Sequence, residues 1–302
     1  MALRLVTFAP HGAPLGGGPA RAGALLNDGE VLDFAAAGLP YAEMTQVIEG
    51  GAEALSAIRA AMAAPAATAR LPLSEVTLCA PIPRPARNVF CVGRNYMDHV
   101  AEGDRTRGIT NSELPKFPQF FTKAPDTVIA HGATIPDHGA TGITKWLDYE
   151  AELTIVVGTA GTNIAPEDAL KHIFGWTIAN DVTGRDLQRR YGQWFKGKSL
   201  DGSCPMGPWI IPADELDASD IAIQLWVNDE MRQSSRTSKM IFDVGQIMHH
   251  LSLGFTLRPG DLIMTGTPEG VGYAMDPPQV LKTGDVVKIA VEGIGELVNP
   301  VG

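Results

Sequence analysis

Apolar residues in this chain occur mostly in short runs that are separated by turn-forming residues, and such runs predict strands. Beyond residue 79, strands are expected at residues 89–92, 152–157, 173–179, 208–211, 221–227, 261–264 and 285–291. Asn228-Asp229-Glu230 predicts a hairpin turn. Helices are expected at residues 166–172, where a proline stands at the start, and at residues 243–251. The pattern predicts a strand-dominated α+β structure over residues 79–302.

The residues before this part form a module of their own. A strand is expected at residues 3–8, and Asn27-Asp28-Gly29 predicts a hairpin because Asp-Gly suits the positive φ of a tight turn. Residues 41–64 are rich in alanine and predict one or two helices that are interrupted at Gly50-Gly51. We predict a small N-terminal domain over residues 1–78. It has no cluster of chemically active side chains and has the size of a cap or a dimerisation arm.

Composition narrows the classes of function. The net charge of −10 argues against a general nucleic-acid binder or membrane-surface binder. No apolar run approaches the roughly 18 residues that a membrane span needs, and the first ten residues lack the pattern of a signal peptide. The cysteines are widely spaced and form no CxxC, which predicts buried reduced thiols: Cys79, Cys91 and Cys204. We therefore expect a soluble cytoplasmic protein.

A pair of acidic residues opens one of the predicted strands. Glu150 and Glu152 are two positions apart, so in a strand they project from the same face. Two such carboxylates are costly to bury unless a cation neutralises them, and oxygen ligands favour Mg²⁺, Ca²⁺ or Mn²⁺. Asp181 stands at the end of another apolar strand and completes a three-carboxylate site, with room left for water and substrate. The alternative is an exposed polar face, with Asp181 capping a helix.

A histidine and a glutamate follow the strand at residues 89–92. His99 and Glu102 are three positions apart, which places them on one face of a helical turn. A carboxylate beside an imidazole orients the ring and stabilises its charged form, so the pair is a candidate general base. Asp98 is a competing partner, although adjacent side chains diverge on a helix. The alternative is a surface histidine with an incidental neighbour.

Groups that could bind an anion follow Asp181. Arg185 and Gln188 are again three positions apart and could hydrogen-bond a substrate carboxylate, and Lys198 could place a cation near that substrate. The Gly-rich loop at residues 264–272 lacks the ending of a phosphate loop, but Thr267 and its backbone N–H groups could hold a carboxylate. We interpret three other basic residues as solvated: Arg189, Arg190 and Lys196.

Taken together, these segments resemble the fumarylacetoacetate hydrolase family. The resemblance runs from about residue 88 to residue 296 and depends on the order and spacing of six segments: GRNYMDHVAE (93–102), PQFFTKAPDTVI (118–129), LDYEAEL (147–153), IANDVTGRDLQ (178–188), KGKSLDGSCPMGPW (196–209) and MTGTPEGVG (264–272). Residues 1–78 resemble the small N-terminal domain of many members.

The resemblance implies a mixed β-roll fold, a homodimer and a bound Mg²⁺ or Mn²⁺. It implies these site residues: metal ligands Glu150, Glu152 and Asp181; a catalytic His99–Glu102 dyad; a catalytic Lys198; and substrate contacts at Arg185, Gln188 and Thr267. The founding hydrolase has an additional, earlier Asp ligand. None of the matched segments supplies a counterpart, so water is expected to take its place.

The family contains enzymes that act on 2-oxo acids in aromatic catabolism, and its motifs do not separate their reactions. Our first expectation is metal-dependent hydrolysis of a C–C bond in an acylpyruvate such as fumarylpyruvate, with an enolate stabilised by the cation. The alternative is decarboxylation or isomerisation of a related 2-oxo or 2-hydroxy-diene diacid. A third reading is a metal-stabilised binding protein without turnover. Specificity is expected in the loops at residues 103–117 and 189–195.

Overall fold

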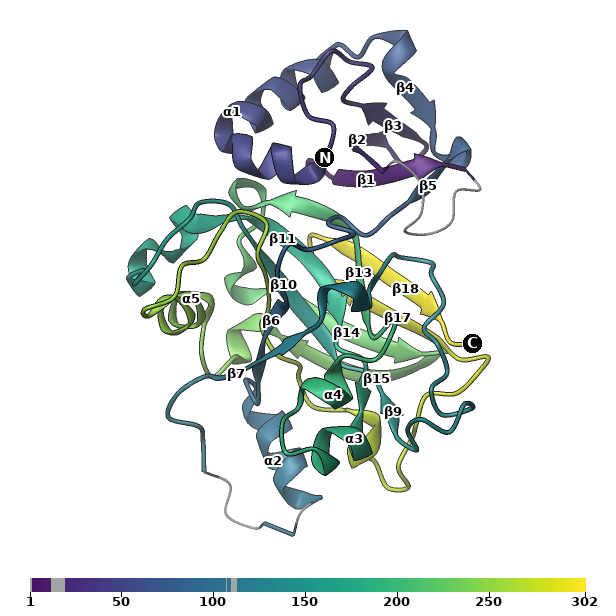
Figure 1. Ribbon diagram of the computed structural model, residues 1–302, viewed down its shortest axis with the longest axis vertical. Coiled ribbons are helices and arrows are strands. Elements are labelled where there is room, and N and C mark those ends of the chain that lie inside the picture. Colours follow the sequence, from purple (N-terminus) through teal and green to yellow (C-terminus); the bar gives the residue numbers. More distant parts are fainter. Residues whose placement is uncertain (1, 12–19, 107, 110–112) are drawn as a thin grey trace.

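The computed structural model describes residues 2–11, 20–106, 108–109 and 113–302 (Figure 1). Its α-helices are α1 (Met44–Ala63), α2 (Met97–Arg105), α3 (Arg185–Arg190), α4 (Phe195–Lys198) and α5 (Val244–Ser252). Its strands before residue 150 are β1 (Leu5–Pro10), β2 (Arg21–Asn27), β3 (Glu30–Asp33), β4 (Arg70–Pro72), β5 (Val76–Leu78), β6 (Val89–Gly93), β7 (Gln119–Lys123), β8 (Val128–Ile129) and β9 (Leu147–Asp148). The later strands are β10 (Ala151–Val157), β11 (Ile173–Asn180), β12 (Thr183–Gly184), β13 (Cys204–Pro212), β14 (Ala222–Val227), β15 (Glu230–Arg236), β16 (Leu262–Met264), β17 (Val286–Val291) and β18 (Gly295–Pro300).

Short 3₁₀ helices connect these elements. They are η1 (Ala67–Ala69), η2 (Leu73–Glu75), η3 (Pro125–Thr127), η4 (Pro166–His172), η5 (Ala213–Glu215), η6 (Ala218–Asp220), η7 (Thr237–Lys239) and η8 (Gly272–Ala274). The helix expected at residues 166–172 is present with these bounds, as the 3₁₀ helix η4. The expected helix at residues 243–251 is confirmed as α5, which begins with a capping box at Asp243.

The N-terminal part consists of β1 to β5 and α1, at the top of Figure 1. Helix α1 is kinked at Gly51, whose φ of 53° is not helical, so the predicted interruption is confirmed. Apolar residues of α1 pack against β2 and β3. The sheet continues into the larger part through the pairing of Leu5 with Ile210. The domain boundary at residue 78 stays a prediction.

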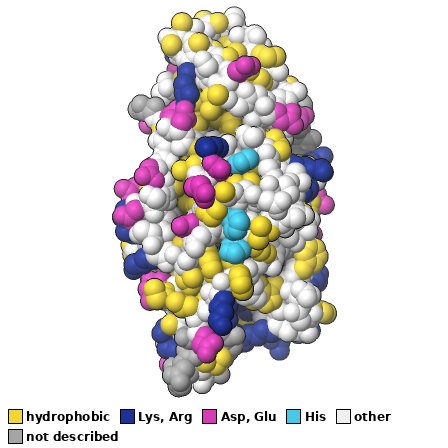
Figure 2. Space-filling model, turned by 90° about the vertical axis from the view of Figure 1, so that its left-hand side faces the viewer, with side chains coloured by type: hydrophobic (Ala, Val, Ile, Leu, Met, Phe, Trp, Pro, Cys, Tyr) yellow, Lys and Arg dark blue, Asp and Glu magenta, His cyan; other side chains and the backbone are white. Residues whose placement is uncertain are grey.

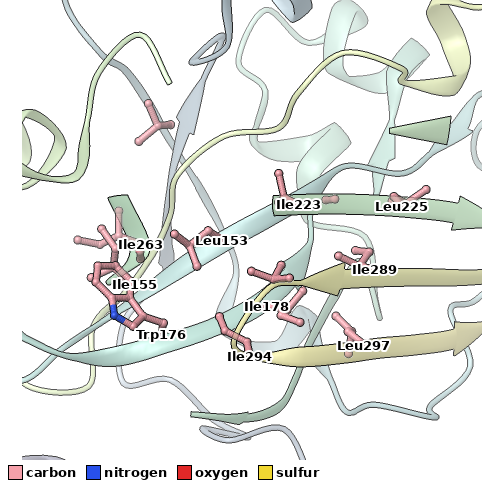
Figure 3. Close-up of a cluster of buried hydrophobic side chains, with 14 of the residues drawn as sticks. Leu153, Ile155, Trp176, Ile178, Ile223, Leu225, Ile263, Ile289, Ile294 and Leu297 are labelled. Atoms are coloured by element: carbon pink, nitrogen blue, oxygen red, sulfur yellow. The ribbon is translucent and has the colours of Figure 1, made fainter. Parts of the chain in front are cut away.

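The larger part is a sandwich of two sheets. One sheet has the order β13-β11-β10-β16-β6-β7, and the other has the order β15-β14-β17-β18. The apolar side chains that fill the space between them include Leu153 and Ile155 of β10, Ile223 and Leu225 of β14, and Ile289 of β17 (Figure 3). The prediction of a strand-dominated α+β fold is confirmed. Since neighbouring residues of a strand alternate between faces, burial of Leu153 and Ile155 on one face of β10 points Glu152 to the other face.

Most strands that were expected from apolar runs are present, but polar strands were not predicted. Strand β15 has the sequence EMRQSSR and forms because β14 and the turn at Asn228, with φ 57°, present a partner edge to it. Cys79, Cys91 and Cys204 are buried and free, as expected. No helix in the described part of the chain is long and apolar enough to cross a membrane. On the face drawn in Figure 2, basic side chains are interspersed with acidic ones.

Candidate metal centre and active site

Strand register brings the three predicted metal ligands together. Strands β10 and β11 pair antiparallel with Ala151 opposite Asn180, and the next pair along the same register is Glu150 and Asp181. The N–H of Asp181 donates to the carbonyl of Glu150 at 2.9 Å. Glu152 is two residues further along, on the same face as Glu150. Strand β10 begins at Ala151, one residue after Glu150. The prediction that Glu150 lies within the strand therefore started the strand one residue too early.

The triad of Glu150, Glu152 and Asp181 is buried, and one carboxylate oxygen from each residue lies within 4.8 Å of the others. Burial raises the pKa of Glu152 well above its ordinary value, and the charges of Asp181 and Glu150 raise it further. A divalent cation would relieve this repulsion and favour the ionised form. The oxygen-only donor set and the burial therefore suit a hard divalent ion such as Mg²⁺, which these three residues would hold.

Two buried lysines contact the triad. The Lys198 ammonium lies 2.6 Å from Glu150 Oε2 and 2.6 Å from Asp181 Oδ2. Lys123, which has no exposed surface, donates to Asp181 Oδ1 at 2.8 Å and to the carbonyl of Lys198. Burial alone would lower the pKa of Lys198, but the charges of Asp181 and Glu150 outweigh burial and raise it. Both ammonium groups therefore orient the acidic side chains and add positive charge beside the position where an ion would bind.

Arg185 contacts two carboxylates, those of Glu150 and Asp148. Its Nη1 lies 2.7 Å from Glu150 Oε1, and its Nε donates to Asp148 Oδ2 at 2.9 Å. Burial would raise the pKa of Glu150, but the charges of Arg185, Lys198 and His99 outweigh burial and lower it. The Nη2 of Arg185 has no well-aligned hydrogen-bond partner among the described residues. That nitrogen nevertheless lies 2.8 Å from Asp148 Oδ2, so it takes part in the ion pair with this carboxylate.

The predicted dyad is present on α2. His99 Nδ1 lies 3.3 Å from Glu102 Oε2, and the other oxygen of Glu102 accepts from the N–H of Gly270 at 2.9 Å. Glu102 is buried, whereas His99 lines the cavity. With Nδ1 donating to Glu102, Nε2 is the basic nitrogen, and this arrangement suits proton transfer to or from a bound molecule.

A cavity of about 460 Å³ joins these groups. Two of the triad, Glu150 and Glu152, line it, and so do most other predicted site residues: His99, Lys198, Arg185, Gln188 and Thr267. Glu102 and Asp181 do not line the cavity, but each contacts a residue that does. Glu102 contacts His99, and Asp181 contacts Lys198. The structure therefore brings all nine predicted residues into one connected cluster.

Several residues of this cluster were not singled out from the sequence. Gln233 accepts from the N–H of Ala151 and donates to the Thr267 hydroxyl at 2.8 Å, so the hydroxyl proton of Thr267 is free to bind a ligand. Arg189, interpreted above only as solvated, lines the cavity. The other residues that were missed are Lys123, Asp148 and Tyr273. Lys123 and Asp148 lie inside quoted segments, but their roles depend on contacts between distant strands.

Gly270 provides a test of how the dyad is held. Its φ is 101°, and an added Cβ would lie 1.9 Å from the carbonyl oxygen of Arg232. We expect Gly270→Ala to displace the N–H that binds Glu102, to lower kcat by roughly 10-fold or more and to destabilise the fold by about 1–3 kcal/mol, as measured by kinetics and thermal unfolding. Gly284→Ala is the control, because Gly284 also has positive φ, 94°, but has open space around it. Equal loss of activity in both variants would contradict a role for Gly270 in holding the dyad.

The chain is similar to several known proteins. A family profile described as fumarylacetoacetate (FAA) hydrolase C-terminal matches residues 88–302. The oxaloacetate tautomerase YisK of Bacillus subtilis (strain 168) is 46% identical over 231 residues, which are 76% of this chain and 74% of that protein. A solved structure of a fumarylacetoacetate hydrolase from Exiguobacterium antarcticum superposes with a TM-score of 0.81 at 40% identity, covering 99% of both chains. A maleylpyruvate hydrolase from Sphingobium sp. SYK-6 superposes with a TM-score of 0.75 at 29% identity, covering 99% of this chain and 98% of that one.

Proposed function

This chain belongs to the fumarylacetoacetate hydrolase family, and from that premise we propose that it is an Mg²⁺-dependent enzyme that tautomerises a 2-oxo acid of the oxaloacetate type. The observation that carries the proposal is that His99 lines the same cavity as Glu150 and Glu152 of the carboxylate triad. Tautomerisation needs an electrophile at the 2-oxo oxygen and a group that moves a proton at the neighbouring carbon. The cavity contains candidates for both.

Charge in the buried cluster fits an anionic 2-oxo acid. The triad and Asp148 contribute four carboxylates, and the three cations in contact with them are Lys123, Lys198 and Arg185. A divalent ion would change the one excess negative charge of this group into one excess positive charge. One carboxylate of a substrate would then balance the cluster, and Arg185 lines the cavity in which that carboxylate would bind.

We propose that His99 moves the proton. Ketonisation of an enol adds a proton to C3 and removes one from the oxygen on C2, so the reaction is balanced without water. A divalent ion held by the triad would polarise the C2 oxygen, and the Lys198 ammonium would add a second positive charge near that oxygen. His99 exchanges a proton with C3 through Nε2, while Glu102 orients the ring and stabilises its charged form.

Hydrolysis of an acylpyruvate is the second candidate, favoured by the 40% identity to a chain described as a fumarylacetoacetate hydrolase. In this reaction His99 would take a proton from water as the water attacks the distal carbonyl. The bond between that carbonyl carbon and C3 would break, and C3 would gain a proton. The two candidates share the 2-oxo acid site and differ in whether water is consumed.

Proton exchange at C3 separates the candidates. With Mg²⁺ and oxaloacetate in D₂O, we expect the protein to accelerate deuterium incorporation at C3 well above the spontaneous rate, without forming pyruvate, as followed by NMR. With fumarylpyruvate, release of fumarate and pyruvate would favour hydrolysis instead. No acceleration with oxaloacetate, fumarylpyruvate or a 2-hydroxy-diene diacid would contradict both proposals and favour the binding protein without turnover.

Other properties follow from the family as proposals. Mg²⁺ is the first choice of metal, with Mn²⁺ or Ca²⁺ as alternatives because the ligands are all oxygen. We also propose that the protein acts as a homodimer, that residues 1–78 and 79–302 are its two domains, that it binds neither nucleic acid nor membranes and that it works in the cytoplasm.

A further inference from the structure

The cavity has a second cationic region that the proposed mechanism does not use. Arg189 is one helical turn beyond Arg185 on α3, and Arg94 directly follows β6. Both residues line the same cavity as Glu150 and Glu152. Neither belongs to the buried cluster whose charges the divalent ion would balance.

Arg189 is held in place by an aromatic ring. Its guanidinium carbon lies 5.3 Å from the centre of the Tyr273 ring, and that of Arg185 lies 4.5 Å from the same centre. Among the described residues no carboxylate forms an ion pair with Arg189, whereas the neighbouring Arg190 lies 3.8 Å from Asp186. A cation stacked on a ring keeps its hydrogen-bond donors free at its edge. Arg189 is therefore oriented but not neutralised by a carboxylate.

Arg94 is fixed through its backbone. Its φ of 55° is unusual for a residue other than glycine, and such strain is commonly found at functional positions. Its Nη2 lies 3.4 Å from Asp104 Oδ1, which is longer than the 2.6–2.8 Å of the ion pairs around the triad. Asp104 belongs to α2, the helix that carries His99, so Arg94 contacts the helix of the dyad.

The charges indicate what this region binds. One carboxylate of a substrate balances the excess positive charge that a divalent ion gives the buried cluster. A second carboxylate on the same molecule would lie in a partly apolar cavity, beside Phe121 and Trp194, and would need a cation of its own. We propose that Arg189, oriented by Tyr273 and assisted by Arg94, forms a second anion subsite that selects 2-oxo acids with a distal carboxylate. This inference rests on the proposed function, since it assumes that the 2-oxo carboxylate binds at the ion.

The test compares substrates with and without the distal charge. For the Mg²⁺-loaded protein, kcat/KM is measured with oxaloacetate and with its 4-methyl ester, and the ratio of the two values reports use of the subsite. We expect Arg189→Gln to lower this ratio by about 10-fold or more, as loss of a charged hydrogen bond predicts. The matched control is Arg190→Gln, because Arg190 is adjacent and exposed, as Arg189 is, but is absent from the cavity lining. An unchanged ratio in Arg189→Gln, or equal losses with both substrates, would overturn the proposal.

A binding measurement separates failure of the subsite from failure of the proposed function. Calorimetric titration of the Mg²⁺-loaded protein with malate and with lactate compares a 2-hydroxy acid that has a distal carboxylate with one that lacks it. We expect the wild type to prefer malate and Arg189→Gln to lose that preference, whether or not oxaloacetate is turned over. Equal binding of malate and lactate by the wild type would overturn the subsite alone. Binding of neither acid would overturn the 2-oxo acid site, and the subsite with it.

Discussion

Replacing Glu152 with glutamine is expected to remove metal binding and turnover together. Burial and the charges of Asp181 and Glu150 raise the pKa of Glu152 well above its ordinary value, and a divalent cation beside it would favour the ionised carboxylate. Without the third carboxylate, Mg²⁺ should no longer raise the melting temperature; in the wild type, saturation at 100 times Kd would add roughly 2.7 kcal/mol of stability. Loss of the ion should lower kcat by about 10³-fold or more.

Without metal, the expected effect of Glu152→Gln on the melting temperature has the opposite sign. Glu152→Gln removes a buried carboxyl group that Asp181 and Glu150 repel when it ionises, so the metal-free variant should melt at or above the temperature of metal-free wild type. Glu53→Gln on the exposed face of α1 is the control and should leave both the Mg²⁺ effect and activity intact. A Glu152→Gln variant that still gains stability from Mg²⁺ would contradict the assignment of Glu152 as a ligand.

The candidate metal site was partly accessible to sequence reasoning, because the placement of Glu150 beside Glu152 is local. The apolar runs around Glu152 and before Asp181 predict two strands, and two-residue periodicity puts Glu150 and Glu152 on one face. Sequence alone does not give the register of β10 against β11, which is what places Asp181 opposite Glu150. The order and spacing of the segments resemble those of a known family. Because members of a family share their tertiary contacts, this resemblance predicted that Asp181 lies beside Glu150.

The residues that support the site could not be predicted in the same way. Gln233 lies in a strand whose polar sequence resembles a loop, and it contacts Thr267 only because the two sheets of the sandwich bring them together. Tyr273 follows the Gly-rich loop and has no motif of its own, yet its ring orients Arg189. Lys123 is buried and donates a hydrogen bond to Asp181, which lies 58 residues later in the sequence. Such roles depend on packing between distant segments, which no local pattern encodes.

Replacing His99 with alanine is expected to abolish proton transfer while leaving the metal site intact. His99 lines the cavity, and among the described residues no hydrogen bond or ion pair joins it to the triad, so Mg²⁺ should still raise the melting temperature of His99→Ala as it does that of the wild type. General acid–base catalysis contributes typically about 10²–10⁴-fold, and kcat for deuterium exchange at C3 should fall by that factor. Glu102→Gln, which keeps a hydrogen-bonding partner for His99 but removes its charge, should lower kcat less.

The pair of measurements on His99→Ala distinguishes its role from that of Glu152. If His99→Ala loses deuterium exchange but Mg²⁺ still raises its melting temperature, His99 transfers the proton. If the variant loses both exchange and the effect of Mg²⁺, α2 only helps to fold the metal site. His11→Ala, at an exposed position far along the chain from the dyad, controls for loss of a histidine as such. Undiminished exchange in His99→Ala would contradict the dyad. Adding imidazole to the alanine variant sharpens the result, because partial recovery of exchange requires that the missing group acted chemically and not by holding α2 in place.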